Sequence, residues 1–190
     1  MYPHPTLIEY NFSWMAFNLT LAFLPLVFAI FYFKSQNILL KFFFFCAWLA
    51  YLPNSAYVIT DMLHFIEQWP IASFTEKPII IWQYVLFEFF GLAAFLFALF
   101  PFEKAMMATK LKKHITAVMI SINFLIGYGM VLGRVHRVNS WQVLTAPDEV
   151  LRAALGVFTS LELLGLTILF ALFNNFLYFL FRGSVRMFFR

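Results

Sequence analysis

Charged residues are scarce in this sequence. Asp, Glu, Lys and Arg together make up 12% of its 190 residues, whereas hydrophobic residues make up 63%. A water-soluble domain cannot bury that much apolar surface, so the composition excludes an ordinary soluble enzyme or binding module. It favours an integral membrane protein whose chain crosses the bilayer several times.

Cysteine and recognisable ligand-binding loops are also nearly absent. Cys46 is the single cysteine, which excludes an intramolecular disulfide and a cysteine-based metal site. The sequence has no glycine-rich loop that would cradle a phosphate and no nucleic-acid-binding motif. We therefore expect membrane lipids, and possible further membrane-protein subunits, as partners rather than nucleic acid. The sequence identifies neither a cofactor nor a metal.

Long apolar runs are abundant. A transmembrane helix needs roughly 20 mainly apolar residues to cross a hydrocarbon core about 30 Å thick. Five segments meet or approach this length, at about 12–33, 38–65, 79–101, 115–133 and 160–181. The last belongs to a longer run from residue 151, whose first turns are expected outside the core or along the interface. We predict an all-α polytopic membrane protein, a single transmembrane domain over residues 1–190. It is a bundle of about five transmembrane helices, with the second broken at Pro53.

The distribution of Lys and Arg predicts the orientation of this bundle. With five spans, nine basic residues fall on the side of the C-terminus: Lys34, Lys41, Lys104, Lys110, Lys112, Lys113, Arg182, Arg186 and Arg190. Four fall on the other side: Lys77, Arg134, Arg137 and Arg152. We therefore expect a cytoplasmic C-terminus and an N-terminus outside.

Two polar stretches interrupt the apolar sequence, and the predicted topology brings both to the extracytoplasmic side. The first, "PNSAYVITDMLH", ends the second span, and the second, "GRVHRVNSWQVLTAPDE", follows the fourth. Asn54, Tyr57, Asp61 and His64 are spaced three or four residues apart, so a helix would present them as one polar stripe. We expect this stripe to lie near Arg134, Arg137, Asn139 and Trp141.

A buried carboxylate near two arginines has several interpretations. Asp61 is expected to pair with Arg134 or Arg137, because a guanidinium can bond a carboxylate twice. The pair could be purely structural, or one arginine could remain free for an anionic group. A metal site formed by Asp61, His64 and His136 is disfavoured, because two arginines would repel the cation. His64 is expected to hydrogen-bond Asp61 or backbone and to act as an acid or base.

Together the two polar stretches resemble a family of bacterial integral-membrane proteins, the domain of unknown function 1361. The first signature is carried by Leu52, Pro53, Asn54, Tyr57, Thr60, Asp61 and His64. The second is carried by Gly133, Arg134, Arg137, Asn139, Ser140, Trp141, Thr145 and Pro147. Gln142 stands where the family usually has aspartate, so an acid at that position is not essential here. The resemblance implies a multi-pass protein of the bacterial inner membrane and no established activity.

The leading functional hypothesis is an extracytoplasmic polar pocket that binds or processes an anionic group, on a lipid or lipid-linked molecule. In this hypothesis Arg134, Arg137 and Asn139 hold the anion, and Asn54, Tyr57 and Trp141 shape the pocket. Asp61 and His64 are the candidate catalytic residues: His64 moves protons, and Asp61 orients His64 or an arginine. The alternative is a non-catalytic subunit or assembly factor of a larger membrane complex. A small transporter is disfavoured because no inverted repeat is visible.

Overall fold

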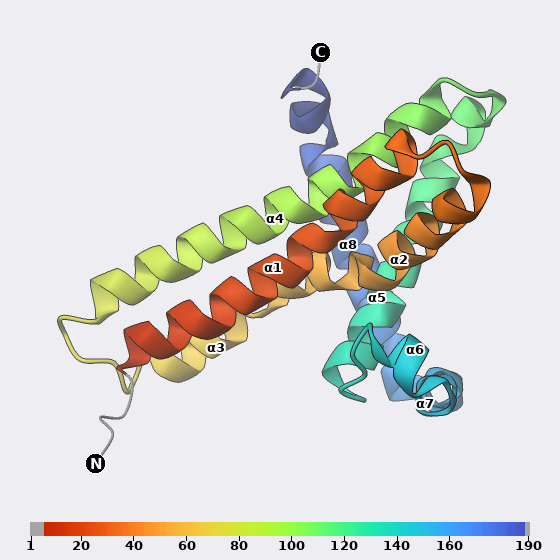
Figure 1. Cartoon of the computed structure of the whole chain (residues 1–190). Coiled ribbons are helices and arrows are strands. Elements are labelled where there is room, and N and C mark those ends of the chain that lie inside the picture. Colours follow the sequence, from red (N-terminus) through yellow and green to blue (C-terminus); the bar gives the residue numbers. More distant parts are fainter. Residues whose placement is uncertain (1–5, 189–190) are drawn as a thin grey trace.

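The computed structural model describes residues 6–188, and this range is helical with no β-strand (Figure 1). Five helical segments are long and apolar enough to cross a membrane, so the predicted all-α multi-pass fold is confirmed. They are α1 (Leu7–Lys34), α2 (Ile38–Tyr57) with its continuation, α4 (Lys77–Met107), α5 (Ile115–Arg134) and α8 (Leu161–Phe188). The shorter elements are η1 (Val58–Thr60), α3 (Met62–Gln68), η2 (Lys110–His114), α6 (Gln142–Thr145) and α7 (Pro147–Thr159).

The helices begin where side chains can satisfy free backbone N–H groups. At the start of α1, Thr6 and Glu9 form a reciprocal capping box, in which each side chain bonds the backbone N–H of the other. Asn37 caps α2 by accepting from the N–H groups of Leu39 and Leu40. In the loop before α4, the N–H and hydroxyl of Ser73 donate to Glu76 and lower the pKa of its carboxyl.

The helices pack in two groups. α1 makes its main contacts with α2 and α4, while α5 makes its main contacts with α8. We call the end that contains the start of α1 the N-terminal side and the opposite end the C-terminal side. On the N-terminal side the groups diverge: α3 lies along α1 and α4, whereas α6 and α7 lie at the end of α5 and α8 (Figure 1).

The second span is interrupted as predicted, but one turn later than Pro53. Pro53 lies inside α2, and the helix changes to the 3₁₀ turn η1 only at Val58 before resuming as α3 at Met62. A proline lacks an N–H and disturbs the preceding turn, so nearby carbonyls need other donors. The Asn54 amide donates to the Tyr51 carbonyl and the Ser55 hydroxyl to the Leu52 carbonyl, at 3.1 and 2.7 Å. Both bonds lie in the part of α2 around the proline, and the chain stays helical to Tyr57.

The long apolar run from residue 151 to 181 forms two helices. α7 ends at Thr159, Ser160 is extended, and α8 begins at Leu161. The Ser160 hydroxyl accepts from the N–H of Leu163 and so caps α8. α7 is amphipathic: its acids Asp148 and Glu149 occupy the first turn, and its leucines are exposed. It belongs outside the spanning helix, consistent with the expectation that these turns lie outside the core or along the interface.

A buried carboxylate closes the C-terminal side of the bundle. Glu103 near the end of α4 is 1% exposed, and both Arg182 and Arg186 of α8 donate to its Oε1. The pairing of Glu103 with α8 was not predicted from the sequence. Because a buried charge is retained only when it is paired, this cluster fixes α8 against α4.

We predict that Gly127→Ala destabilises the protein by about 1–3 kcal/mol, because overpacking a close helix contact forces the backbones apart. A Cβ atom at Gly127 would lie 2.7 Å from the Ala171 nitrogen and 2.9 Å from the Thr167 carbonyl oxygen. Gly165→Ala is the matched control, since nothing lies within 4 Å of its Cβ position. Unfolding by SDS in mixed micelles measures both variants. Equal stability of the two would contradict the close approach of α5 to α8.

Candidate functional site

The polar residues of the N-terminal side gather around the interruption of the second span. Asp61, between η1 and α3, is 1% exposed and lies at the centre of the group. Its Oδ1 is 3.7 Å from Nη1 of Arg134, the last residue of α5. The Asn18 amide of α1 reaches the other carboxylate oxygen at 3.5 Å. The ion pair expected between Asp61 and one of two arginines is therefore present, and Arg134 forms it.

The environment of Arg134 extends beyond the carboxylate. Its Nη1 donates to the Thr60 hydroxyl at 2.7 Å, and its guanidinium lies over the ring of Tyr57, 5.2 Å from the centroid. Within residues 6–188, Nε and Nη2 of Arg134 make no hydrogen bond, and the side chain is 24% exposed. A guanidinium carries five N–H donors, so Arg134 holds Asp61 and retains donors for another acceptor.

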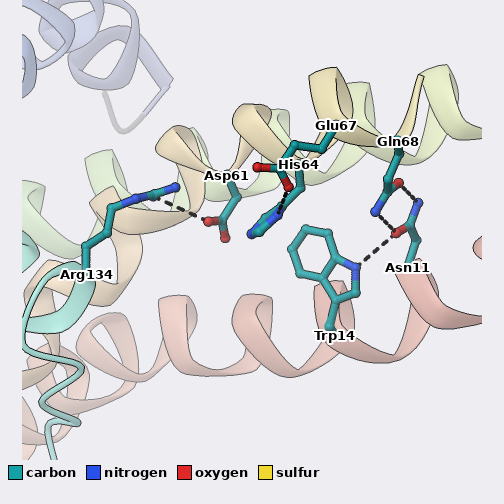
Figure 2. A network of polar contacts seen from close by, with 7 residues as sticks. All are labelled: Asn11, Trp14, Asp61, His64, Glu67, Gln68 and Arg134. Atoms are coloured by element: carbon teal, nitrogen blue, oxygen red, sulfur yellow. Dashed lines mark hydrogen bonds and ion pairs between the residues drawn. The ribbon is translucent and has the colours of Figure 1, made fainter. Parts of the chain in front are cut away.

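His64 does not bond Asp61, contrary to one of the expectations. Its Nδ1 is 3.4 Å from Oε2 of Glu67, and its ring meets Trp14 of α1 edge to face, with centroids 5.4 Å apart. Figure 2 shows the imidazole between the Asp61 carboxylate and the Trp14 indole. The α3 helix begins directly after Asp61, which directs His64 towards α1. About half of the His64 side chain is exposed at the surface of the protein.

A reciprocal amide pair, not predicted from the sequence, holds α3 against α1. Asn11 and Gln68 exchange two hydrogen bonds of 2.8 Å, and the Trp14 indole donates to Asn11 at 3.0 Å (Figure 2). Both amides are buried, with Asn11 fully inaccessible. Two buried amides that satisfy each other fix the position of one helix relative to another. The pair therefore holds His64 and Asp61 in place.

The second polar stretch packs on the first at Asn54. The Asn54 amide donates to the Ser140 hydroxyl, and that hydroxyl donates to the Ala50 carbonyl, each at 3.0 Å. Beside this contact is a cleft of about 100 Å³ between α2, α5 and the loop after α5. Its lining includes Tyr57 and Asn139. Trp141 does not line it and is 41% exposed at the start of α6.

Arg137 differs from Arg134 in having no partner. It is exposed, adopts a positive φ of 53°, and makes no hydrogen bond or ion pair within residues 6–188. Its charge and that of Arg134 both lie close enough to Tyr57 to act on it electrostatically. A non-glycine residue at positive φ is uncommon and is held there by its surroundings.

Other candidate groups do not join the cluster. His136 lies against Gly156 of α7, and no group of three potential metal-ligating side chains occurs in the described part of the chain. Glu162 is exposed in the first turn of α8. Glu88 of α4 lies close enough to Asp61 to interact electrostatically, and its buried Oε1 has no hydrogen-bond partner among residues 6–188. Neither glutamate bonds an arginine.

A comparison with protein families shows which family this chain belongs to. The family described as "Protein of unknown function (DUF1361)" matches residues 17–177. The chain belongs to the DUF1361 family. No curated protein and no solved structure matches it. The matched range of the DUF1361 chain contains the interruption of the second span, the Asp61–Arg134 pair and the cleft at Asn54.

Several residues of the DUF1361 site could not be found by motif. Asn11, Asn18 and Gln68 are isolated polar residues in apolar or mixed segments. The Asn11–Gln68 and Asn18–Asp61 partners lie 57 and 43 residues apart in sequence. Thr60 and Ser140 stood in the recognised stretches, but their roles as acceptors for Arg134 and Asn54 depend on tertiary structure. One signal could have pointed to them. A polar side chain is costly in a membrane segment, so each such residue is expected to have a partner.

We predict that Arg134→Gln destabilises the protein by about 3–5 kcal/mol, because it leaves the Asp61 carboxylate buried without its partner. The double variant Asp61→Asn/Arg134→Gln should recover much of this loss, since it leaves no unpaired charge. Arg137→Gln is the control and should change stability by less than about 0.5 kcal/mol, as expected for an exposed side chain. SDS unfolding of the three variants tests this. A single Arg134→Gln variant as stable as Arg137→Gln would show that the pair does not hold the bundle.

Proposed function

We propose that the N-terminal side faces the extracytoplasmic space and binds an anionic group through Arg134 and Arg137. The observation that carries this proposal is the unequal pairing of charge. Asp61 is the only acid bonded to either arginine within the described range, and it engages one nitrogen of Arg134. The two guanidiniums together therefore keep a net positive charge and free donors. The Arg134 guanidinium lies over the ring of Tyr57, which lines the cleft with Asn139, although neither arginine is itself a lining residue.

The surrounding residues have distinct proposed roles. Asp61 orients Arg134, and Asn54 holds Ser140 so that the wall of the cleft stays closed against α2. Asn139 offers a side-chain amide to the bound group. His64 is the residue we assign to proton transfer, because imidazole exchanges protons near neutral pH and this one is accessible beside Asp61. Trp141 contributes at the membrane interface rather than in the cleft.

A second candidate is a purely structural subunit of a larger membrane complex. The observation that favours it is the number of polar groups that satisfy one another across helices, above all the reciprocal Asn11–Gln68 pair. Such contacts lock a bundle without binding anything. This candidate requires no ligand at Arg137, so the binding measurement below separates the two.

We predict that Arg137→Gln lowers the retention of anionic phospholipid about fivefold, the ratio that corresponds to about 1 kcal/mol for one basic residue at a membrane surface. Protein in nanodiscs of mixed phosphatidylglycerol and phosphatidylcholine is released into the gas phase, and retained lipids are identified by native mass spectrometry. Inorganic phosphate in excess serves as a competitor and distinguishes a free anion from a lipid headgroup.

Arg152→Gln is the matched control, because Arg152 is an exposed arginine on the same side, in α7, that bonds backbone of its own helix. It should leave lipid retention unchanged. Equal losses in the two variants would reduce the effect to general surface charge. No loss in Arg137→Gln would overturn the anion-binding proposal and leave the structural candidate.

We also predict the orientation of the chain from its unpaired charges. Six lysines of the C-terminal side, Lys34, Lys41, Lys104, Lys110, Lys112 and Lys113, form no ion pair within residues 6–188. In a Cys46→Ser background, Phe74→Cys in the loop before α4 should react with an impermeant maleimide added to intact cells, and Lys112→Cys should react only after lysis. Phe74 is 91% exposed, so its reactivity depends on its side of the membrane. The reverse pattern would invert the proposed orientation.

A further inference from the structure

A groove with apolar walls runs between the second span and α8 on the N-terminal side. Its volume is about 380 Å³, within the range of ligand-binding pockets. One wall comes from η1 and α3 and the other from α8: the lining residues are Ile59, Thr60, Met62, Leu63, Ile66, Leu169, Phe170 and Phe173. The side chains of Leu63, Ile66 and Leu169 are more than half exposed. They belong to helices that are long enough to span a membrane.

Thr60 connects this groove to the proposed anion site. It is the one hydroxyl in the lining, and it accepts the 2.7 Å hydrogen bond from Arg134 Nη1. At the groove, η1 and α3 pack on α4, while α8 packs mainly on α5 and also contacts α4 and α7. The Arg134 guanidinium therefore lies where the two groups of helices diverge.

We propose that the bound molecule is an anionic lipid, with its headgroup at Arg134 and Arg137 and one acyl chain in the groove between α3 and α8. This inference rests on the proposed function and adds the class of ligand and the position of its chain. A free anion would use the arginines and leave the groove unoccupied by any part of the ligand. The apolar walls that continue from Thr60 match a molecule with a charged head and a hydrocarbon tail.

A second groove provides an internal comparison. It lies between α1 and α4 on the C-terminal side, has a volume of about 530 Å³, and is lined by apolar residues together with Lys34 and Lys104. Both lysines are exposed and neither forms an ion pair within residues 6–188. General attraction of anionic lipid to a basic surface would act at this groove as well.

Photocrosslinking of lipids tests the proposal on the full-length protein. Phosphatidylglycerol and phosphatidylcholine with the same diazirine-bearing acyl chain are incorporated separately into nanodiscs, and labelled peptides are mapped by mass spectrometry. We expect phosphatidylglycerol to label residues 59–66 and 169–173 about fivefold more than phosphatidylcholine does, with the excess lost in Arg137→Gln. Leu169→Trp, which places an indole in the groove, should also abolish the excess.

Leu172→Trp is the matched control, because Leu172 is equally apolar, exposed on the same helix and outside the groove. It should preserve the excess. Equal enrichment at the α1–α4 groove, or equal effects of the two tryptophans, would overturn the groove assignment. If lipid retention depends on Arg137 but labelling is even along the helices, the anion site stands and the chain position is wrong. If neither retention nor labelling depends on the headgroup, both proposals fail.

Discussion

The ion pair between Asp61 and Arg134 is the interaction on which the rest of the N-terminal side depends. A carboxylate buried inside the protein needs a partner, and Asp61, which is 1% exposed, has the Arg134 guanidinium at the end of α5. That requirement ties the interrupted second span to α5, with Asn18 of α1 as a further donor. The direction of α3 then follows, and with it the position of His64 beside Trp14. A single partnered charge thereby connects three of the spanning segments.

The two charged clusters of the protein differ in how completely their charges are used. On the C-terminal side, the buried Glu103 carboxylate forms ion pairs with two arginines of α8, so both arginines are engaged. On the N-terminal side, Asp61 engages one nitrogen of Arg134, and Arg137 bonds no residue among those that the structure describes. Structural and binding roles are therefore compatible at this site, because the acid that locks the bundle leaves positive charge beside a cleft.

Hydropathy was sufficient to predict the five long helices, because a spanning segment must be apolar over a fixed length whatever its neighbours are. Spacing and charge predicted that Asp61 would meet an arginine, but not which one. The position of the interruption was harder to predict: Pro53 lies inside α2, and the helix changes to a 3₁₀ turn only at Val58. The Asn11–Gln68 pair and the burial of Glu103 could not be predicted from the sequence. Each depends on a partner brought close only by the packing of whole helices.

The bond network around Ser140 has a consequence for how the chain is assembled in the membrane. Ser140 accepts from Asn54 and donates to the Ala50 carbonyl, yet it is synthesised 86 residues after Asn54. When the second span first enters the bilayer, its weakened turn and Asp61 therefore lack both Ser140 and Arg134. The interrupted segment can mature only after the fourth span has followed it. Assembly of this site is thus completed late. The second span is synthesised first and gains these partners only after the loop that follows α5 has been made.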